Sequence, residues 1–165
     1  MSKTQEALME AFAGESQANR KYLAFAAKAD QEGFSQAARL FRAAAEAETV
    51  HAHAHLRAAK GIGLTKENLR EAVAGERYEF ESMYPPMIEA AKAEGNKEAE
   101  RSLAYAFEVE KIHARLYQEM LDNIDKTQEA YSYYVCPVCG YTVEKEAPEA
   151  CPICAAKGKM FRKVD

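Results

Sequence analysis

The stretch Glu46-Ala47-Glu48-Thr49-Val50-His51 returns 62 positions later as Glu108-Val109-Glu110-Lys111-Ile112-His113. On an α-helix, a residue and the one three places further along share a face. Glu48 and His51 therefore point in the same direction, and so do their counterparts in the second copy. The repeat predicts two equivalent helices, each presenting one carboxylate and one imidazole.

A Gly-Glu pair precedes each copy at a matching distance. Glu15 lies 33 residues before Glu48, and Glu76 lies 34 residues before Glu110. Two successive helices joined as a hairpin give this spacing. The chain is therefore predicted to contain two helical hairpins, each carrying Glu … Glu-x-x-His, which amount to an internally duplicated metal site.

Strong helix formers and helix-breaking residues divide the first three quarters of the chain into four long helices. The expected ranges are 2–31, 35–60, 66–94 and 97–125. Ser35 and Thr65 are the expected caps of the second and third helices. Pro85 and Pro86 should kink or split the third helix. Four such helices with short joints predict a four-helix bundle.

Charge and hydropathy exclude several classes of partner. The 165-residue chain has a formal net charge of −4, so it has no basic footprint for nucleic acid or anionic lipid. Its polar start is not followed by an apolar run of signal-peptide length, and no apolar run is long enough for a membrane span. We therefore expect a cytoplasmic protein with no nucleic-acid or membrane partner.

The composition changes after Thr127, where strand-favouring Tyr, Val and Thr alternate with Gly and Pro. This change predicts a boundary between about 126 and 132, with a helical domain over 1–128 and a small domain over 132–165. The second domain is too short to be stabilised by a hydrophobic core alone, so it needs disulfides or a bound metal ion to hold it together.

All four cysteines lie in this tail, as two C-x-x-C pairs with eleven residues between them: Cys136, Cys139, Cys151 and Cys154. In a chain without an export signal, this pattern favours a metal over disulfides. Four thiolates suit a tetrahedral metal, which would hold the tail together. Judged alone, the tail favours redox-silent zinc; attached to a redox bundle, it favours a one-electron iron centre.

Five carboxylates are predicted to converge inside the bundle, and they could not all remain ionised there without cations. Two divalent ions would supply four positive charges, and mixed carboxylate and imidazole ligation suits iron or manganese, with zinc as an alternative. The competing interpretation treats these residues as solvated positions on alanine-rich helices, but two copies in register argue against it. The five are Glu15, Glu48, Glu76, Glu79 and Glu110.

Two tyrosines lie close to these positions in the sequence. Tyr22 follows Glu15 by seven residues and Tyr84 follows Glu76 by eight, so both can line the site. They are interpreted either as core aromatics or as hydrogen-bond donors to a ligand carboxylate.

These motifs together resemble the rubrerythrins over the whole chain. The resemblance rests on Gly14-Glu15, Glu48-x-x-His51, Gly75-Glu76-x-x-Glu79, Glu110-x-x-His113, Tyr22, Met83-Tyr84-Pro85 and the four cysteines. It implies an all-α, ferritin-like four-helix bundle followed by a small rubredoxin-like domain.

The resemblance also implies roles for individual residues. Glu48 and Glu110 would bridge two iron ions, and the terminal ligands would be Glu15, His51, Glu76, Glu79 and His113. One iron would exchange Glu79 for His51 between oxidation states, with Tyr22 and Tyr84 as hydrogen-bond donors. The cysteines would hold a third iron.

The implied activity is that of a peroxidase that reduces hydrogen peroxide to water in oxidative-stress defence. Its electrons would come from a reductase or rubredoxin, drawing indirectly on NAD(P)H, through the cysteine centre. We expect a homodimer or higher homo-oligomer, in which each tail serves the partner's site. A ferroxidase and a zinc-stapled, non-enzymatic metal-binding protein are the alternatives.

Two departures from the family pattern stand out. Ala155 occupies the position after the fourth cysteine where glycine is common, which is expected to strain that knuckle. The connection at 61–64 is short, which leaves open whether helices are exchanged between subunits.

Overall fold

The structure is a computed structural model, and it describes residues 2–126 and 129–165. By compactness the chain divides into two units, one ending at Gly63 and the other beginning at Leu64. The first unit is a helical hairpin. The second contains another hairpin together with the cysteine-bearing tail.

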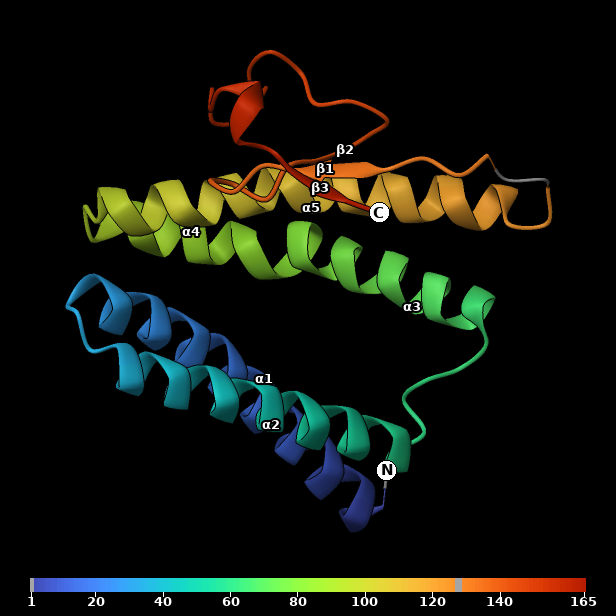
Figure 1. Cartoon of the computed structure of the whole chain (residues 1–165). Helices are drawn as coiled ribbons and strands as arrows, with labels where there is room; N and C mark the ends of the chain where they lie inside the picture. The colour runs from blue at the N-terminus through green and yellow to red at the C-terminus, as the bar shows by residue number, and fades with distance from the viewer. Residues whose placement is uncertain (1, 127–128) are drawn as a thin grey trace. The chain divides into compact units, whose positions relative to one another are not determined.

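In the first unit, α1 (Lys3–Gln31) and α2 (Ser35–Ala58) run side by side, as Figure 1 shows. Gly33 ends α1 with a φ of +83°, and the Phe34 amide then donates to the Ala29 carbonyl. The buried residues of these two helices are all small, which lets the helix backbones approach closely: Ala26, Ala29, Ala38, Ala45 and Ala52.

A polar contact also ties the two helices together. The Asn19 side chain on α1 donates to the Ala45 carbonyl at 2.7 Å and to the Thr49 hydroxyl at 2.9 Å. Thr49 directly follows Glu48, so this contact fixes the relative register of α1 and α2 beside a predicted metal ligand.

The helices of the second unit are α3 (Thr65–Tyr78), α4 (Tyr84–Ala93) and α5 (Lys97–Asn123), and a π-helix, η1 (Glu79–Met83), joins α3 to α4. Helix α5 packs against α3, η1 and α4. Pro85 and Pro86 have no amide proton to donate to the preceding turn. The wider π turn ends at Met83, one residue before Tyr84-Pro85, so the α-helix is interrupted near the prolines as predicted, while the chain stays helical from α3 through α4.

The tail forms a three-stranded antiparallel sheet of β1 (Tyr133–Val135), β2 (Thr142–Glu144) and β3 (Arg162–Val164), in the order β2-β1-β3. Tyr134 is paired with Val143 on one side and with Lys163 on the other. Strand β2 contacts α5, and a short 3₁₀ helix (Gly158–Met160) precedes β3. The predicted fold class, an all-α part followed by a small domain with short strands, is confirmed.

The expected side-chain caps are wrong. The N-cap positions of α2 and α3 are Phe34 and Leu64, with Ser35 and Thr65 as first helical residues and no side-chain cap. At α3 the Glu67 carboxylate instead accepts from the Leu64 amide at 2.7 Å. A residue whose side chain cannot accept a hydrogen bond can still occupy the N-cap position when a carboxylate three residues later accepts from its backbone amide.

The predicted boundary at 126–132 lies partly outside the described residues, since Thr127 and Gln128 fall there. The described part of the tail belongs to the same compact unit as α3, α4 and α5. The division into 1–128 and 132–165 remains a prediction.

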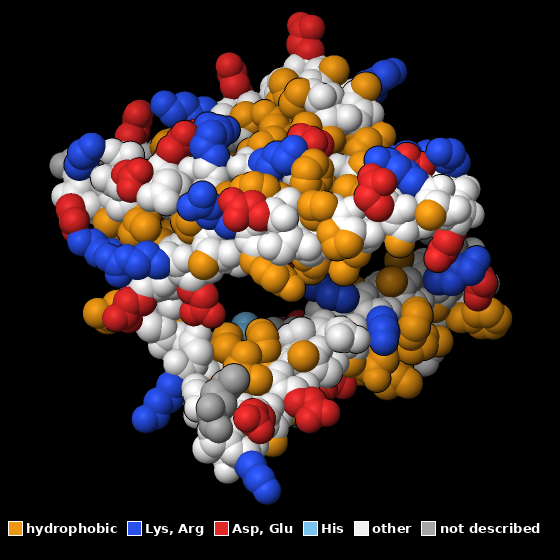
Figure 2. All heavy atoms as spheres, turned by 180° about the vertical axis from the view of Figure 1, so that it is seen from behind, with side chains coloured by type: hydrophobic (Ala, Val, Ile, Leu, Met, Phe, Trp, Pro, Cys, Tyr) orange, Lys and Arg blue, Asp and Glu red, His pale blue; other side chains and the backbone are white. Residues whose placement is uncertain are grey.

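The helix surfaces carry charges of both signs. Figure 2 shows Lys and Arg side chains interspersed with Asp and Glu along the helices. Several form pairs one turn apart, such as Lys111 with Glu108 at 2.8 Å and Arg115 with Glu119 at 3.1 Å. Within the described ranges, none of the helices combines the length and apolar character that crossing a bilayer would require.

Candidate functional site

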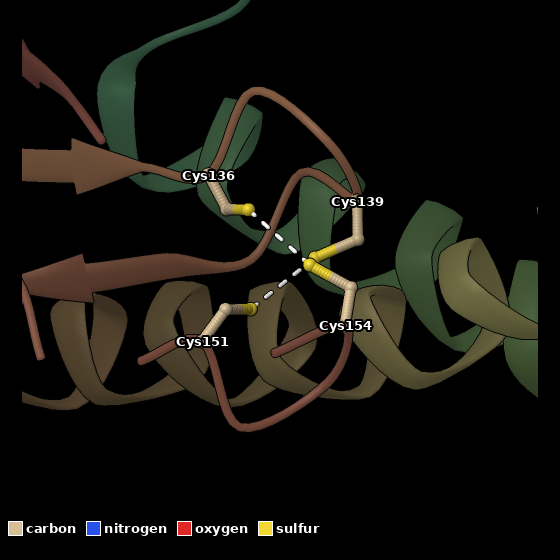
Figure 3. A group of neighbouring side chains, drawn as sticks. All are labelled: Cys136, Cys139, Cys151 and Cys154. Atoms are coloured by element: carbon tan, nitrogen blue, oxygen red, sulfur yellow. Dashed lines mark hydrogen bonds between the residues drawn. The ribbon is translucent and has the colours of Figure 1, made fainter. Parts of the chain in front are cut away.

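The four cysteines converge at one point in the tail. Figure 3 shows their side chains pointing toward one another from two loops. The Cys136 and Cys154 sulfurs are 3.6 Å apart, and the Cys139 and Cys151 sulfurs are 3.5 Å apart. All four thiols are free, and those of Cys136 and Cys151 belong to buried residues.

These separations fit a tetrathiolate metal site. A disulfide needs sulfurs about 2.05 Å apart. Four sulfurs about 2.3 Å from a central metal are about 3.8 Å from one another in a tetrahedron. Burial raises the pKa of the Cys139 thiol, so a cation is needed to hold this group as a thiolate. The donor set therefore fits a single iron or zinc ion.

Both cysteine loops have the same backbone hydrogen bonds. The Gly140 amide donates to the Cys136 carbonyl, and the Ala155 amide donates to the Cys151 carbonyl, each at 2.9 Å. The residue after the second cysteine of each loop has a positive φ, +86° at Gly140 and +61° at Ala155. The strain expected at Ala155 thus has a structural basis, because the left-handed backbone conformation is unfavourable for a residue with a Cβ atom.

The first unit brings together Glu15 from α1 and Glu48 and His51 from α2. The His51 Nδ1 atom is 2.8 Å from the Glu48 Oε2 atom and 3.9 Å from the Glu15 Oε1 atom. Two carboxylates therefore face one ring nitrogen, so these three residues, the first triad, can ligate a divalent metal ion.

The second unit repeats the arrangement with Glu76 from α3 and Glu110 and His113 from α5. The His113 Nδ1 atom is 2.7 Å from the Glu110 Oε2 atom and 3.8 Å from the Glu76 Oε2 atom. These three residues form the second triad. Its distances agree with those of the first to within 0.1 Å, so the sequence repeat is also a repeat of geometry.

The carboxylates of the second triad repel one another. Burial, followed by the neighbouring Glu110 carboxylate, raises the pKa of Glu76 to about 7. A divalent cation would remove this repulsion, because it interacts favourably with both carboxylates in their ionised forms. The residues therefore fit a metal ion, on the chemistry of the donors and on their mutual repulsion.

Glu79 and Tyr84 lie close enough to the second triad for its Glu110 carboxylate to shift their pKa values. Burial and then the Glu110 carboxylate raise the pKa of Glu79. Burial and then the same carboxylate raise the pKa of Tyr84. Glu79 is the first residue of the π-helix, a feature often found at functional sites, and it lies outside the compact group of ligand atoms.

Tyr22 occupies an aromatic cluster in the first unit. Its ring centroid is 6.2 Å from that of Phe41 and 6.4 Å from that of Phe25. These contacts hold the ring of Tyr22 against aromatic neighbours in its own hairpin, on a partly exposed surface. A hydrogen bond from Tyr22 to a ligand carboxylate remains a prediction, and so does the union of the two triads in one di-iron centre.

The second unit also contains a cavity of about 380 Å³ beside its triad. Glu76, His113 and Thr142 form its polar lining. The apolar and aromatic part of the lining comes from α3, α5 and β1: Leu69, Leu116, Tyr117, Met120 and Tyr133. A water molecule occupies about 30 Å³, so the cavity admits a molecule as small as hydrogen peroxide.

Sequence reasoning missed two residues of this site. Tyr117 lies four residues after His113, which was an available signal of a shared helix face. Burial, followed by the Glu76 carboxylate, raises its pKa, so its hydroxyl lies near the triad. Thr142 lies 3.0 Å from the His113 Nε2 atom, and no periodicity could reveal a contact between segments 29 residues apart.

Two family models match the chain, one described as rubrerythrin over residues 6–121 and one as the rubrerythrin rubredoxin-like domain over residues 134–162. The chain is 37% identical to rubrerythrin-2 of Clostridium acetobutylicum, covering 96% of this chain and 95% of that protein. It is 38% identical to rubrerythrin of Porphyromonas gingivalis, covering 97% and 89%.

Nigerythrin of Nitratidesulfovibrio vulgaris is also similar, at 38% identity over 92% of this chain and 81% of that protein. Among solved structures, one described as the partially reduced state of nigerythrin matches with a TM-score of 0.60 and 34% identity, covering 99% of this chain and 88% of the other. A structure of nigerythrin in its fully reduced, all-ferrous state also gives a TM-score of 0.60, at 33% identity. From its two domain matches and these relatives, the chain belongs to the rubrerythrin family, a family of oxidoreductases with a rubredoxin-like domain.

Proposed function

We propose that this chain is a non-haem di-iron peroxidase that reduces hydrogen peroxide to water in defence against oxidative stress. The observation that carries the proposal is the occurrence of two triads of matching geometry in one chain, beside four convergent cysteines. We propose that the two triads form one centre, in which two metal ions would act on one substrate and a third would pass electrons to them.

The ligands of the two irons would be the residues of both triads together with Glu79. Bound iron would supply the two electrons that, with two protons, convert one hydrogen peroxide into two waters. Carboxylates suit this task because anionic ligands favour the ferric state. Glu48 and Glu110 are the proposed bridging ligands, and Glu79 and His51 are proposed to exchange at one iron between oxidation states.

The aromatic side chains near the second triad would orient the substrate. The raised pKa of Tyr84 keeps the proton on its hydroxyl oxygen, which can then donate a hydrogen bond. The cavity beside Glu76 and His113 offers space for the peroxide. Tyr22 is proposed to play the corresponding donor role in the first unit.

The cysteine centre would deliver electrons one at a time. A single iron held by four thiolates changes its charge by one, so each peroxide requires two successive transfers from an external reductase or rubredoxin. We propose that the reductase draws on NAD(P)H and that the protein acts in the cytoplasm as a homodimer or higher homo-oligomer.

The test compares oxidants on protein loaded with iron and reduced without oxygen. Stopped-flow absorbance should show faster oxidation by hydrogen peroxide than by dioxygen. Faster oxidation by dioxygen would indicate a ferroxidase instead. A colourless tail after iron-replete aerobic preparation would indicate zinc, because ferric tetrathiolate is intensely red.

Matched variants on one helix make the test specific. Glu110→Ala should lower the iron content and abolish peroxide-dependent turnover, because it removes a proposed bridging ligand. Glu108→Ala is the control, since Glu108 pairs with Lys111 on the surface of α5. Equal iron content and turnover in the two variants would refute the proposed ligand set.

A further inference from the structure

The imidazole of His113 has partners on both ring nitrogens. Its Nδ1 atom faces the carboxylates of Glu110 and Glu76, at 2.7 and 3.8 Å. Its Nε2 atom lies 3.0 Å from the hydroxyl oxygen of Thr142. Thr142 is the first residue of β2, so one imidazole joins the helical part of the second unit to its cysteine-bearing tail.

The hydrogen bonds around Thr142 have a defined direction. Its hydroxyl donates to the Gly140 carbonyl at 3.0 Å. A hydroxyl has one proton, so while it donates to Gly140 the Thr142 oxygen can only accept from His113, which requires the proton to be on Nε2. This arrangement leaves the Nδ1 atom as the nitrogen that can bind a metal, on the side where the two carboxylates lie.

The carbonyl that orients Thr142 belongs to a cysteine loop. Gly140 directly follows Cys139, and its amide donates to the Cys136 carbonyl at 2.9 Å. A Cβ atom on Gly140 would lie 3.7 Å from Val109, a buried residue one turn before His113 on α5. The loop that presents two of the four thiols therefore lies directly against the helix that presents the imidazole.

We propose that Thr142 is a positioning residue that couples metal binding at the cysteine site to metal binding at the second triad. A metal on the four thiols orders the cysteine loop and fixes the Gly140 carbonyl. That carbonyl orients the Thr142 hydroxyl, which selects the His113 tautomer that a second metal needs. The proposal rests on His113 being a metal ligand, as the proposed function has it.

The coupling has a thermodynamic consequence. If a metal at the cysteines raises the affinity of the triad, a metal at the triad raises the affinity of the cysteines by the same factor. The contact also lies within one chain. This coupling therefore does not require the arrangement expected from the sequence, in which each tail serves the partner's site.

The test measures affinity of the full chain for ferrous iron alone, by anaerobic competition with a chelator. Thr142→Val keeps the size of the side chain and removes its hydroxyl, and Thr142→Ser restores the hydroxyl. With the tail loaded, Thr142→Val should weaken iron binding at the triad about 10- to 100-fold, the usual effect of losing a partner behind a metal-binding histidine. Thr142→Ser should stay close to the parent chain.

A second arm tests the coupling itself. Removing the tail metal from the parent chain should weaken the triad by a similar factor, and Thr142→Val should add no further loss in that state, because the two changes break the same link. The colour of the ferric tetrathiolate checks that the tail of each loaded variant is folded. Equal losses in Thr142→Val and Thr142→Ser, additive losses on stripping, or no loss in Thr142→Val would each overturn the proposal.

The failure of the proposed function would look different. In that case Glu110→Ala and His113→Ala would leave ferrous iron binding of the parent chain unchanged. If Glu110→Ala and His113→Ala weaken ferrous iron binding but Thr142→Val does not, the proposed metal ligands are supported. Only the positioning role of Thr142 is then rejected.

Discussion

Replacing Ala155 with glycine should stabilise the cysteine tail. Ala155 has a φ of +61° and follows Cys154, while its counterpart Gly140 has a φ of +86° and follows Cys139. The amide of each donates to the carbonyl of the first cysteine of its loop. One loop therefore has the residue suited to this conformation, and the other has an L-residue in the same conformation.

The expected magnitude follows from two opposing terms. A left-handed conformation costs an L-residue about 1–2 kcal/mol. Glycine removes this cost but has more freedom in the unfolded chain, which costs about 0.5–1 kcal/mol. Ala155 is exposed, so its methyl group contributes little packing. The net stabilisation of the tail by Ala155→Gly is about 0.5–1 kcal/mol.

The assay is the rate at which a chelator bleaches the ferric tetrathiolate in mild denaturant. When opening of the tail equilibrates faster than capture of the metal, the rate follows the open population. A change of 0.5–1 kcal/mol then slows bleaching by about two- to fivefold. Gly140→Ala should accelerate it by a similar factor, because it introduces the strain that Ala155→Gly removes.

Ala156→Gly is the matched control, because Ala156 is not among the residues with a positive φ. Ala156→Gly relieves no strain and only increases the conformational freedom of the unfolded chain. The chelator should therefore bleach this variant faster than the parent chain. Slower bleaching in Ala156→Gly, or unchanged bleaching in Ala155→Gly, would refute the argument from backbone conformation.

Three further predictions concern other contacts. Gly158→Ala should destabilise the tail by about 1–3 kcal/mol and speed its bleaching, because the new Cβ atom would lie 1.9 Å from the Pro148 carbonyl oxygen. Asn19→Ala should lower the free energy of unfolding by about 1–3 kcal/mol, measured by denaturant titration of the full chain, because two hydrogen bonds between α1 and α2 are lost; an unchanged midpoint would contradict it. Lys60→Gly should raise the same free energy by about 0.5–1 kcal/mol, since Lys60 ends α2 with a φ of +57°; a lower midpoint would show that the lysine side chain makes a larger contribution.

The triads could be read from the sequence because their geometry is mostly local. Glu48 and His51 are one turn apart on a helix, so the spacing alone places the carboxylate next to the imidazole, and the structure has them 2.8 Å apart. The pairing with Glu15 requires the hairpin as well. A short turn at Gly33 and small residues along both helices make that hairpin predictable.

The starts of α2 and α3 could not be predicted in the same way. Ser35 and Thr65 have side chains that often cap helices, but Phe34 and Leu64 occupy the cap positions. Cap preferences are small terms, about 1 kcal/mol, and tertiary packing outweighs them. The π-helix shows the same limit, since the prolines predict an interruption without predicting its type.

Thr142 represents a third kind of limit. Its contact with His113 exists because β2 packs on α5, and neither segment contains a signal of the other. A threonine after a cysteine loop is an ordinary strand residue by composition. Only the placement of the tail brings Thr142 to His113, which is why the sequence predicts the cysteines and the histidine as separate local motifs and gives no sign of their connection.

The point where the internal repeat fails is as informative as the repeat itself. Each triad offers two carboxylates and one imidazole; as metal ligands the two carboxylates would carry two negative charges and the imidazole none, which would balance one divalent ion. A ferric ion would leave one positive charge uncompensated at each triad. The second unit has Glu79 three residues after Glu76, whereas the first has Ala18 three residues after Glu15. If Glu79 is a ligand as proposed, one half of the duplicated site would compensate a ferric ion with an extra carboxylate, and the other half would not. If Glu79 joins the second triad at its iron, this asymmetry would make the two irons inequivalent in their redox behaviour even though the triads share one geometry.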